Sequence, residues 1–455
     1  PRRSARRISI SSRRPRQTHA TLKRPISLPA TTDVEIAVIG AGIAGIATAY
    51  YLCVEHGRRS LVLIDPRPPM SYTSAQSGDN YRNWWPHPVM TAFTNDSIDE
   101  LDRLAHDTDD IFNMTRGGYV LATRRDDIAE YRAAIQPGVD VSFFEGATAH
   151  ERFPALANDI QNVIHIHRGG DISGQQLGTW MLEQIRNSGG KLLRGAVSTI
   201  SNDKRFTLEI TGPTDTSEIY ADVVINAAGP FAHRVAAMLG EELPVSNIFE
   251  QKVAFEDRLG AIPRDMPFSI DLDEKTLGWS DEERALLEDD PDLSWLTQRL
   301  PGGTHCRPEG GEHGNWVKLG WAYNHTASEP QEDLANEPLS DPQFPEIVMR
   351  GAAAFIPALA PYVESPPTRY SHYGGYYTMT EENWPLIGPM ATDGAYMVAG
   401  LSGFGSMSAC AAGKLCATRI CGGPLPGYAE ALSLGRYDNT GLMHELHNAT
   451  SKGVL

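Results

Sequence analysis

Residues 34–52 read VEIAVIGAGIAGIATAYYL. A short β-type apolar run leads into the glycine turn Gly40-Ala41-Gly42-Ile43-Ala44-Gly45, and an Ala-rich stretch of helical character follows. Residues 60–64 then predict a second buried strand, which ends in Asp65, twenty residues past Gly45. Strand, glycine turn, helix, strand and acid in this order form the context that a dinucleotide-binding unit requires.

Each residue of this turn has an expected role. Gly40 permits the tight turn, Gly42 lets the backbone approach a pyrophosphate, and Gly45 allows the helix to pack closely on the strand. The backbone N–H groups of Ile43 and Ala44 begin the helix whose N-terminus would face the pyrophosphate. The alternative is a glycine-rich turn without a ligand.

Asp65 narrows the choice of nucleotide. A carboxylate here accepts hydrogen bonds from the adenosine ribose and disfavours a 2'-phosphate, so NAD or FAD is expected rather than NADP. An NAD dehydrogenase would continue with regular βα units, whereas residues 73–86 read TSAQSGDNYRNWWP and predict a polar loop. This loop, with Ser74 as a candidate cofactor contact, favours FAD extended across two domains.

The composition is that of a folded globular protein, with 41% hydrophobic and 21% charged residues among 455. No apolar run reaches about 18 residues, so no transmembrane helix is expected. The five cysteines show no CxxC and no metal-ligand spacing. We therefore expect reduced thiols, with neither a disulfide scaffold nor a metal site.

The charge is unevenly distributed. Residues 1–30 hold eight Arg, one Lys and no acid, so the other 31 basic residues face 57 acidic ones, a balance of −26. A body this acidic repels nucleic acid. The basic arm could dock on an acidic surface of its own or a neighbouring subunit, act as a targeting segment, or stay solvated. We expect a cytoplasmic protein or, given the Arg-rich N-terminus, an organellar one such as a mitochondrial protein.

The remaining pattern predicts an α/β fold with a Rossmann-type FAD-binding domain. Because an antiparallel-sheet substrate domain is interleaved with it, the whole chain is α+β. Residues 220–229, YADVVINAAG, predict a further buried strand that ends at Gly229, a candidate cofactor contact, before a helix from Pro230. A strand, glycine and helix this late indicate that the nucleotide domain is discontinuous, while strands alternating with Pro/Gly turns over 247–325 indicate an antiparallel sheet. The predicted divisions are an arm at 1–32, an FAD domain at 33–113, 171–246 and 370–430, a substrate domain at 114–170 and 247–369 with an acidic surface insertion at 271–292, and a tail at 431–455.

The C-terminal region returns to cofactor-type elements. A strand at 395–399, a glycine-rich turn at 400–405 and a small-residue helix at 406–421 follow one another. N–H groups at such a helix start can stabilise negative charge on the reduced flavin, although a plain packing turn is the alternative. The candidate contacts are Gly403, Phe404, Gly405, Ser406 and Met407.

Three motifs, GAGIAG with Asp65, VVINAAGP, and WPLIGP with VAGLSGFGSM, together resemble the D-amino-acid oxidase superfamily of FAD-dependent oxidoreductases. This superfamily includes glycine oxidase, sarcosine oxidase and D-amino-acid dehydrogenases, and the likeness runs from about residue 33 to about 425. The resemblance implies a parallel-sheet FAD domain interleaved with an antiparallel substrate domain, the isoalloxazine lying between them. It also implies oxidation of a C–N bond, or less often a C–O bond, by hydride transfer to flavin N5.

The sequence departs from the resemblance at substrate-binding positions. Tyr377 stands where glycine-oxidase-like members place an Arg, and Met407 stands where the sarcosine branch places a Lys that holds the carboxylate. Arg82 is similar in placement to an active-site Arg of that branch, and it could clamp a carboxylate or form an ion pair that holds its loop. Asn315, three residues before Lys318-Leu319-Gly320, replaces the Cys that bonds to flavin, so FAD is expected to bind non-covalently. Cys306 is the alternative attachment point.

Several side chains are candidates for the chemistry itself. Lys252 opens the predicted substrate sheet and could assist oxygen reduction, or lie on the surface. His305 and Arg307 alternate on a predicted strand and would face the same side. If that side is the flavin cavity, His305 could accept the amine proton and Arg307 could bind an acid group; if it faces solvent, neither has a role. Aromatic walls or core positions are expected at Tyr376, Tyr377, Trp84 and Trp85.

Three functions remain open from the sequence. The first is an FAD-dependent oxidase or dehydrogenase that converts an amine or amino acid to an imine. The second is an FAD-dependent 2-hydroxy-acid dehydrogenase on the same scaffold. The third is an FAD-containing assembly or scaffold subunit of a larger complex, gripping a partner or another copy of the chain through the basic arm.

Overall fold

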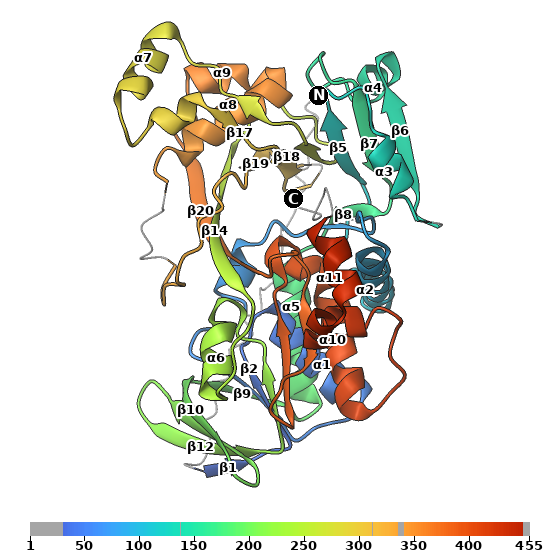
Figure 1. The fold of residues 1–455 in the computed structure, drawn as a ribbon, viewed down its shortest axis with the longest axis vertical. Coiled ribbons are helices and arrows are strands. Elements are labelled where there is room, and N and C mark those ends of the chain that lie inside the picture. Colours follow the sequence, from blue (N-terminus) through green and yellow to red (C-terminus); the bar gives the residue numbers. More distant parts are fainter. Residues whose placement is uncertain (1–30, 137, 312, 335–340, 449–455) are drawn as a thin grey trace, which may run out of the picture.

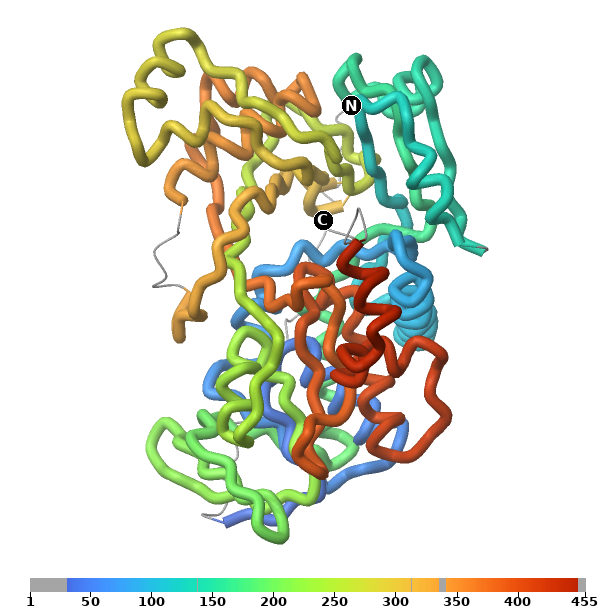
Figure 2. The backbone as a smooth tube through the Cα atoms, in the orientation of Figure 1, coloured from blue at the N-terminus to red at the C-terminus, as the bar shows by residue number. Residues whose placement is uncertain are grey.

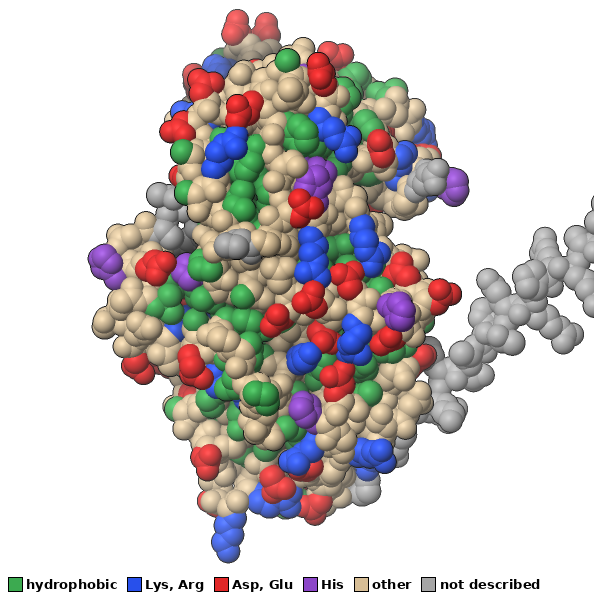
Figure 3. All heavy atoms as spheres, turned by 90° about the vertical axis from the view of Figure 1, so that its right-hand side faces the viewer, with side chains coloured by type: hydrophobic (Ala, Val, Ile, Leu, Met, Phe, Trp, Pro, Cys, Tyr) green, Lys and Arg blue, Asp and Glu red, His purple; other side chains and the backbone are tan. Residues whose placement is uncertain are grey.

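The computed structural model describes residues 31–136, 138–311, 313–334 and 341–448. Two large sheets dominate, one in each half of Figure 1. Within the described ranges no helix is long and apolar enough to cross a membrane, and no cluster of His, Cys, Asp or Glu could hold a metal ion. The basic arm at 1–30 lies outside the described residues. On the face drawn in Figure 3, acidic and basic side chains are intermixed.

The lower half of Figure 1 holds a six-stranded sheet in the order β21-β22-β13-β2-β3-β9. Its neighbouring strands pair in parallel except β21 with β22. The sheet therefore collects strands from three distant parts of the chain. The strands are β2 (Ile36–Ile39), β3 (Leu61–Asp65), β9 (Lys191–Arg194), β13 (Val223–Asn226), β21 (Leu386–Pro389) and β22 (Ala395–Ala399).

Two helices bring the glycine turns of this sheet together. Helix α1 (Ile43–Tyr50) begins after the first turn, and α10 (Gly405–Cys421) begins after the last and packs against α1. A Cβ at Gly413 would lie 2.6 Å from the backbone carbon of Ala47, so small residues allow this close approach. Figure 2 shows the blue and red segments side by side. The other helices of this half are α2 (Pro88–Asp107), α5 (Gly174–Asn187), α6 (Ala232–Met238) and α11 (Thr440–His447).

A four-stranded sheet below the parallel one was not predicted. Its order is β1-β12-β11-β10, with alternate side chains such as Phe206, Leu208 and Ile210 buried. The alternation is short and flanked by polar residues, so it gave a weak signal. The strands are β1 (Thr31–Asp33), β10 (Ala196–Asn202), β11 (Phe206–Thr211) and β12 (Thr216–Ala221).

The second large sheet has eight strands in the order β20-β14-β19-β18-β15-β5-β7-β6. All neighbours are antiparallel except β15 with β5. The Pro/Gly-rich pattern of 247–325 predicts an antiparallel arrangement for four of the eight strands, β14, β15, β18 and β19. The strands are β5 (Tyr119–Thr123), β6 (Val141–Glu145), β7 (Asn162–Ile166), β14 (Ser246–Glu256), β15 (Phe268–Asp271), β18 (Thr304–Glu309), β19 (Trp316–Gly320) and β20 (Tyr370–Met379).

One predicted boundary and one predicted surface position differ in the structure. Residues 370–379 were assigned to the FAD domain, but as β20 they pair with β14 in the eight-stranded sheet. The acidic insertion 271–292 is predicted as a solvated face with a surface helix around 281–288. Its first residue differs, since Asp271 is fully buried and forms ion pairs with Arg124 at 3.0 Å and Lys275 at 2.6 Å. The surface part is α7 (Asp281–Asp289), which buries none of its residues.

One face of the eight-stranded sheet is covered by helices. Helix α8 (Phe344–Phe355) packs on β14, β18 and β19, and α9 (Ala360–Glu364) continues from it. The smaller elements are α3 (Ala129–Ala133), α4 (Ala147–Arg152), the β4 (Asn80–Arg82) and β8 (Gly169–Asp171) ladder, and the β16 (Lys275–Thr276) and β17 (Arg299–Leu300) ladder. The opposite face of the sheet is left to line an interior site.

Candidate active site

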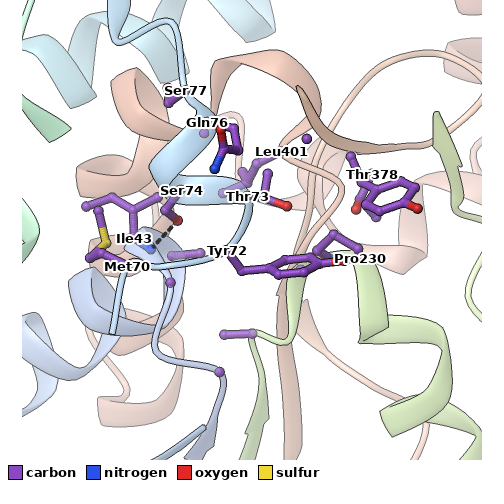
Figure 4. Close-up of a pocket in the computed structure, with 18 of the residues that line it drawn as sticks. Ile43, Met70, Tyr72, Thr73, Ser74, Gln76, Ser77, Pro230, Thr378 and Leu401 are labelled. Atoms are coloured by element: carbon purple, nitrogen blue, oxygen red, sulfur yellow. Dashed lines mark hydrogen bonds between the residues drawn. The ribbon is translucent and has the colours of Figure 1, made fainter. Parts of the chain in front are cut away.

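A long cleft runs from the ends of the parallel strands to β20 and β14, with about 1060 Å³ of unoccupied space, part of it open to solvent. Its walls come from the turns after β2, β3, β13 and β22 and from the edge of the eight-stranded sheet. Figure 4 shows side chains from these separate segments converging on the space. Such a crevice at the carboxyl ends of parallel strands is where open α/β sheets bind ligands.

The first glycine turn fits closely against the rest of the sheet. Gly40 has φ +110°, and a Cβ there would overlap the carbonyl oxygen of Ala227. A Cβ at Gly45 would overlap the carbonyl oxygen of Gly40. Both positions therefore admit only glycine, as the dinucleotide motif predicts.

The start of α1 faces the cleft. The N–H of Ile43 donates to Ser74 Oγ at 3.0 Å, the contact drawn as a dashed line in Figure 4. A Cβ at Gly42 would approach the same hydroxyl to 3.1 Å. Backbone donors and a hydroxyl thus meet at the positive end of the helix, where an anionic pyrophosphate can be bound.

Asp65 closes this end of the site at the tip of β3. Its two carboxylate oxygens accept the N–H groups of Ala41 and Arg67, each at 2.8 Å. Burial raises its pKa, and these two bonds oppose that rise. Each oxygen keeps further acceptor capacity for a ribose hydroxyl. Arg67, which the sequence reasoning did not select, lies 4.5 Å from the Tyr72 ring and 4.8 Å from the Phe231 ring.

The second glycine turn, after β22, forms the opposite wall with Gly229. Gly403, Gly405 and Ser406 all line the cleft, and a Cβ at Gly403 would lie 2.5 Å from the Tyr377 ring. Phe404 points away from the cleft into the core, its ring 5.0 Å from that of Trp85.

Asp79, which the sequence does not single out, lies behind the cleft wall and holds Ser406. The Ser406 hydroxyl donates to its carboxylate at 2.8 Å and lies 2.9 Å from Ser77 Oγ. Asp79 has φ +59°, a conformation that Asp tolerates better than most residues. The Gly-Asp pair within the 73–86 loop was the available signal for this turn.

Arg82 and Met407 lie beyond Ser406, in the interior. The Arg82 guanidinium lies between the rings of Trp85 and Tyr119, at 4.7 and 4.8 Å from their centroids. Its backbone N–H donates to the Met407 sulfur at 3.4 Å. Met407 therefore packs against the Arg82 segment.

The wall from the eight-stranded sheet carries Lys252 and Tyr377. Both line the cleft, and the Lys252 ammonium lies 5.3 Å from the centroid of the Tyr377 ring. Lys252 is 4% exposed, so it does not lie on the surface. Burial lowers its pKa, while Glu250 and Asp79 oppose that effect. Burial also raises the pKa of Tyr377, which keeps the phenol protonated.

His305 and Arg307 lie on β18, on the same face of the sheet and buried rather than solvated. His305 Nδ1 lies 2.9 Å from the Gly303 carbonyl oxygen, and burial lowers the His305 pKa to about 4. The ring is therefore a weak proton acceptor. Arg307 forms ion pairs with Asp171 at 3.0 Å and with Glu309 at 2.7 Å, so its charge is already balanced by protein carboxylates.

Cys306 alternates with these two side chains and points to the other face of β18. It is fully buried in the core under α8, and burial raises its pKa. Asn315 is exposed and donates to Glu256 at 2.9 Å. Neither residue lines the cleft, which favours the predicted non-covalent mode of cofactor binding.

The structure thus brings most of the predicted residues to one cleft. The residues that line it are Gly40, Gly42, Ile43, Ala44, Asp65, Ser74, Gly229, Lys252, Tyr377, Gly403, Gly405 and Ser406. Those that lie behind its walls are Gly45, Arg82, His305, Arg307, Phe404 and Met407.

The family follows from these features and from sequence. The model of the FAD dependent oxidoreductase family matches residues 35–419, which include both glycine turns and the eight-stranded sheet. The chain belongs to this family. Its cofactor is FAD. The backbone N–H donors of the two glycine turns and the carboxylate acceptor of Asp65 fit this group. The predicted membership of the D-amino-acid oxidase superfamily is confirmed.

Similar proteins include the uncharacterized oxidoreductase YurR of Bacillus subtilis, 26% identical over 234 residues, 48% of this chain and 61% of that protein. Mitochondrial dimethylglycine dehydrogenase of Mus musculus is 24% identical over 300 residues, 61% of this chain. The match spans less than two thirds of YurR and 34% of the dehydrogenase.

Solved structures share the fold. L-proline dehydrogenase from P. horikoshii has a TM-score of 0.71 at 20% identity, covering 90% of this chain and 99% of the other. Glycine oxidase from Geobacillus kaustophilus has a TM-score of 0.69 at 16% identity, covering 89% and 99%. The Rossmann-type architecture with a second sheet is confirmed.

Proposed function

We propose that this FAD-dependent oxidoreductase oxidises the C–N bond of an amino acid or secondary amine to an imine. The observation that carries the proposal is the buried Lys252 ammonium, which faces the cleft beside Tyr377 and the Gly403–Ser406 turn. Among the described residues no carboxylate forms an ion pair with this ammonium, although the charges of Glu250 and Asp79 act on it, and such a cation suits the carboxylate of an amino acid. The names of dimethylglycine dehydrogenase, L-proline dehydrogenase and glycine oxidase also point to amine-bearing acids.

Each wall of the cleft suggests a separate role in the reaction. FAD, when bound, supplies the acceptor for a hydride from the carbon that bears the nitrogen. The first glycine turn and Asp65 would hold its nucleotide end, and the second turn and Ser406 would hold the other. Lys252 would bind the substrate carboxylate, and Tyr377 would form an apolar wall that excludes water.

Product analysis tests the proposal. The holoenzyme is incubated with sarcosine, N,N-dimethylglycine, L-proline, and D- and L-alanine, in air and separately with a dye as acceptor. A carbonyl product formed when the imine hydrolyses, with amine released from the open-chain substrates and with ring opening for proline, supports C–N oxidation. Turnover of lactate or glycolate alone would instead establish the 2-hydroxy-acid reaction. Turnover in air, against turnover only with dye, separates an oxidase from a dehydrogenase.

A further inference from the structure

Three segments that are far apart in the sequence meet at the Asp79 carboxylate, behind the second glycine turn. One oxygen of this carboxylate accepts the Ser406 hydroxyl at 2.8 Å, and the other accepts the N–H of Gly174, at the start of α5, at 3.1 Å. A Cβ at Gly174 would lie 2.8 Å from the Asp79 carboxylate and 3.1 Å from the Ser406 hydroxyl. Because Gly174 has no side chain, both groups fit, and each carboxylate oxygen has one fixed donor.

Ser77 extends this arrangement to the surface of the cleft. Its hydroxyl oxygen accepts the N–H of Asp79 at 3.1 Å and lies 2.9 Å from the Ser406 hydroxyl oxygen. Ser77 and Ser406 both line the cleft, and Figure 4 shows Ser77 next to Gln76. The two hydroxyls therefore connect the Asp79 carboxylate to the space that the cofactor would occupy.

The number of protons fixes the direction of these hydrogen bonds. A serine hydroxyl has one proton, and an ionised carboxylate has none. The Ser406 proton lies in the bond to Asp79, so the proton between the two hydroxyls must come from Ser77. Among the described residues no other donor reaches either hydroxyl oxygen. Each serine therefore offers the cleft a lone pair and no proton.

This part of the wall lies at the substrate end of the cleft. A Cβ at Gly78 would lie 3.9 Å from Lys252 Cε, and the charge of Asp79 acts on the Lys252 ammonium. It is Ser74, not Ser77, that contacts Ile43, where the pyrophosphate can be bound. The part of FAD that Ser77 and Ser406 would face is therefore the isoalloxazine ring.

We propose that Asp79 is a positioning residue that holds Ser77 and Ser406 as hydrogen-bond acceptors for the N–H group of the isoalloxazine ring. Oxidised flavin has one such group, N3–H, whereas the ring carbonyl oxygens need donors and do not suit this wall. Asp79 lies behind the wall and acts by keeping both hydroxyl protons out of the cleft. The inference concerns how FAD is held and does not depend on the proposed C–N oxidation.

The first test is a double-mutant cycle on FAD affinity, measured by titrating each apoprotein with FAD. In Asp79→Asn the amide oxygen must face the Gly174 N–H, so the amide NH2 faces Ser406 and one hydroxyl proton is left to oppose N3–H. Asn also tolerates the φ of +59° at this position, so the loop should keep its conformation. We expect FAD affinity to fall about tenfold in Asp79→Asn. Added to Ser406→Ala, the same substitution should change the affinity by less than about twofold.

An equal effect of Asp79→Asn with and without the Ser406 hydroxyl would overturn the inference, because the carboxylate would then act through α5 or its own loop. Unchanged FAD affinity in Asp79→Asn would overturn it as well. Asp203→Asn, the same substitution at an exposed position, serves as the matched control. Near-ultraviolet circular dichroism of each apoprotein verifies folding.

The second test changes the cofactor instead of the protein. FAD is compared with 3-methyl-FAD, in which a methyl group replaces the N3 proton, on wild type and on Asp79→Asn. A purely structural role of Asp79 would weaken the binding of both ligands equally. We expect methylation to cost wild type about tenfold more affinity than it costs Asp79→Asn. An equal cost in the two proteins would overturn the inference.

Discussion

The two ends of the cleft differ in what lines them: backbone atoms at one end and side chains at the other. The nucleotide end uses backbone atoms of one short stretch, Gly40 to Gly45, together with Asp65. The substrate end uses side chains from β14 and β20, which come together only when the eight-stranded sheet forms. At the nucleotide end, any side chain in place of the glycines would clash, so the backbone keeps one geometry. At the substrate end, a substitution can change the chemistry without changing the backbone.

This difference explains why the cofactor is easier to identify than the substrate. A glycine turn admits few sequences, so its pattern is diagnostic. A pleated sheet face accepts many side chains, and the family uses that freedom to vary what is bound. Variants at the two ends should therefore fail in different ways.

The largest effect is expected for Gly45→Val at the nucleotide end. Its Cβ would overlap the Gly40 carbonyl oxygen, so the turn cannot close and FAD binding should weaken by more than about 100-fold, or roughly 3 kcal/mol. The ratio of flavin to protein absorbance after purification measures this. Gly117→Ala is the control, because nothing lies within 4 Å of a Cβ there. Full flavin content in Gly45→Val would contradict the account.

At the substrate end, Lys252→Met should spare FAD and impair the reaction. Loss of the cation removes a buried charge-assisted contact worth about 2–3 kcal/mol, so kcat/KM for an amino acid should fall roughly 30- to 150-fold. Lys204→Met, at an exposed position, should leave it unchanged. An unaltered kcat/KM in Lys252→Met would show that the carboxylate binds elsewhere, with Arg82 as the next candidate.

A smaller effect is expected for Asp65→Asn. The amide keeps one acceptor oxygen, so one of the two backbone bonds, to Ala41 or Arg67, should be lost. We expect FAD affinity to fall about tenfold, or roughly 1.4 kcal/mol. Titration of the apoprotein with FAD measures the change, and Asp203→Asn, at an exposed position, provides the reference. Equal affinities in the two variants would remove Asp65 from the site.

The smallest effect is expected for Cys306→Ala. The thiol lies in the core and away from the cleft, so the variant should lose only about 1 kcal/mol of stability and keep its flavin. Acid denaturation should release the flavin from wild type and variant alike. Flavin that stays attached to denatured wild type but leaves Cys306→Ala would identify a covalent link that the structure does not support.

Much of the nucleotide end could be predicted from sequence because its signals are local. The strand at 36–39, the glycine turn and Asp65 fall within one stretch whose spacing carries the geometry. The pairing of β20 with β14 could not be read in this way, since residues 370–379 resemble any half-buried strand. Asp79 could not be selected for a related reason: a single acid shows its burial and its neighbours only after the loop that carries it has folded against Ser406.

Anaerobic flavin reduction tests the central claim most directly. The holoenzyme, with flavin content confirmed, is mixed without oxygen with matched pairs that differ only in nitrogen against oxygen, such as sarcosine and methoxyacetate or alanine and lactate. The account predicts that an amine-bearing acid bleaches the flavin band and that its oxygen counterpart does not. Bleaching by the oxygen compounds alone, or by no compound while FAD is bound, would contradict it.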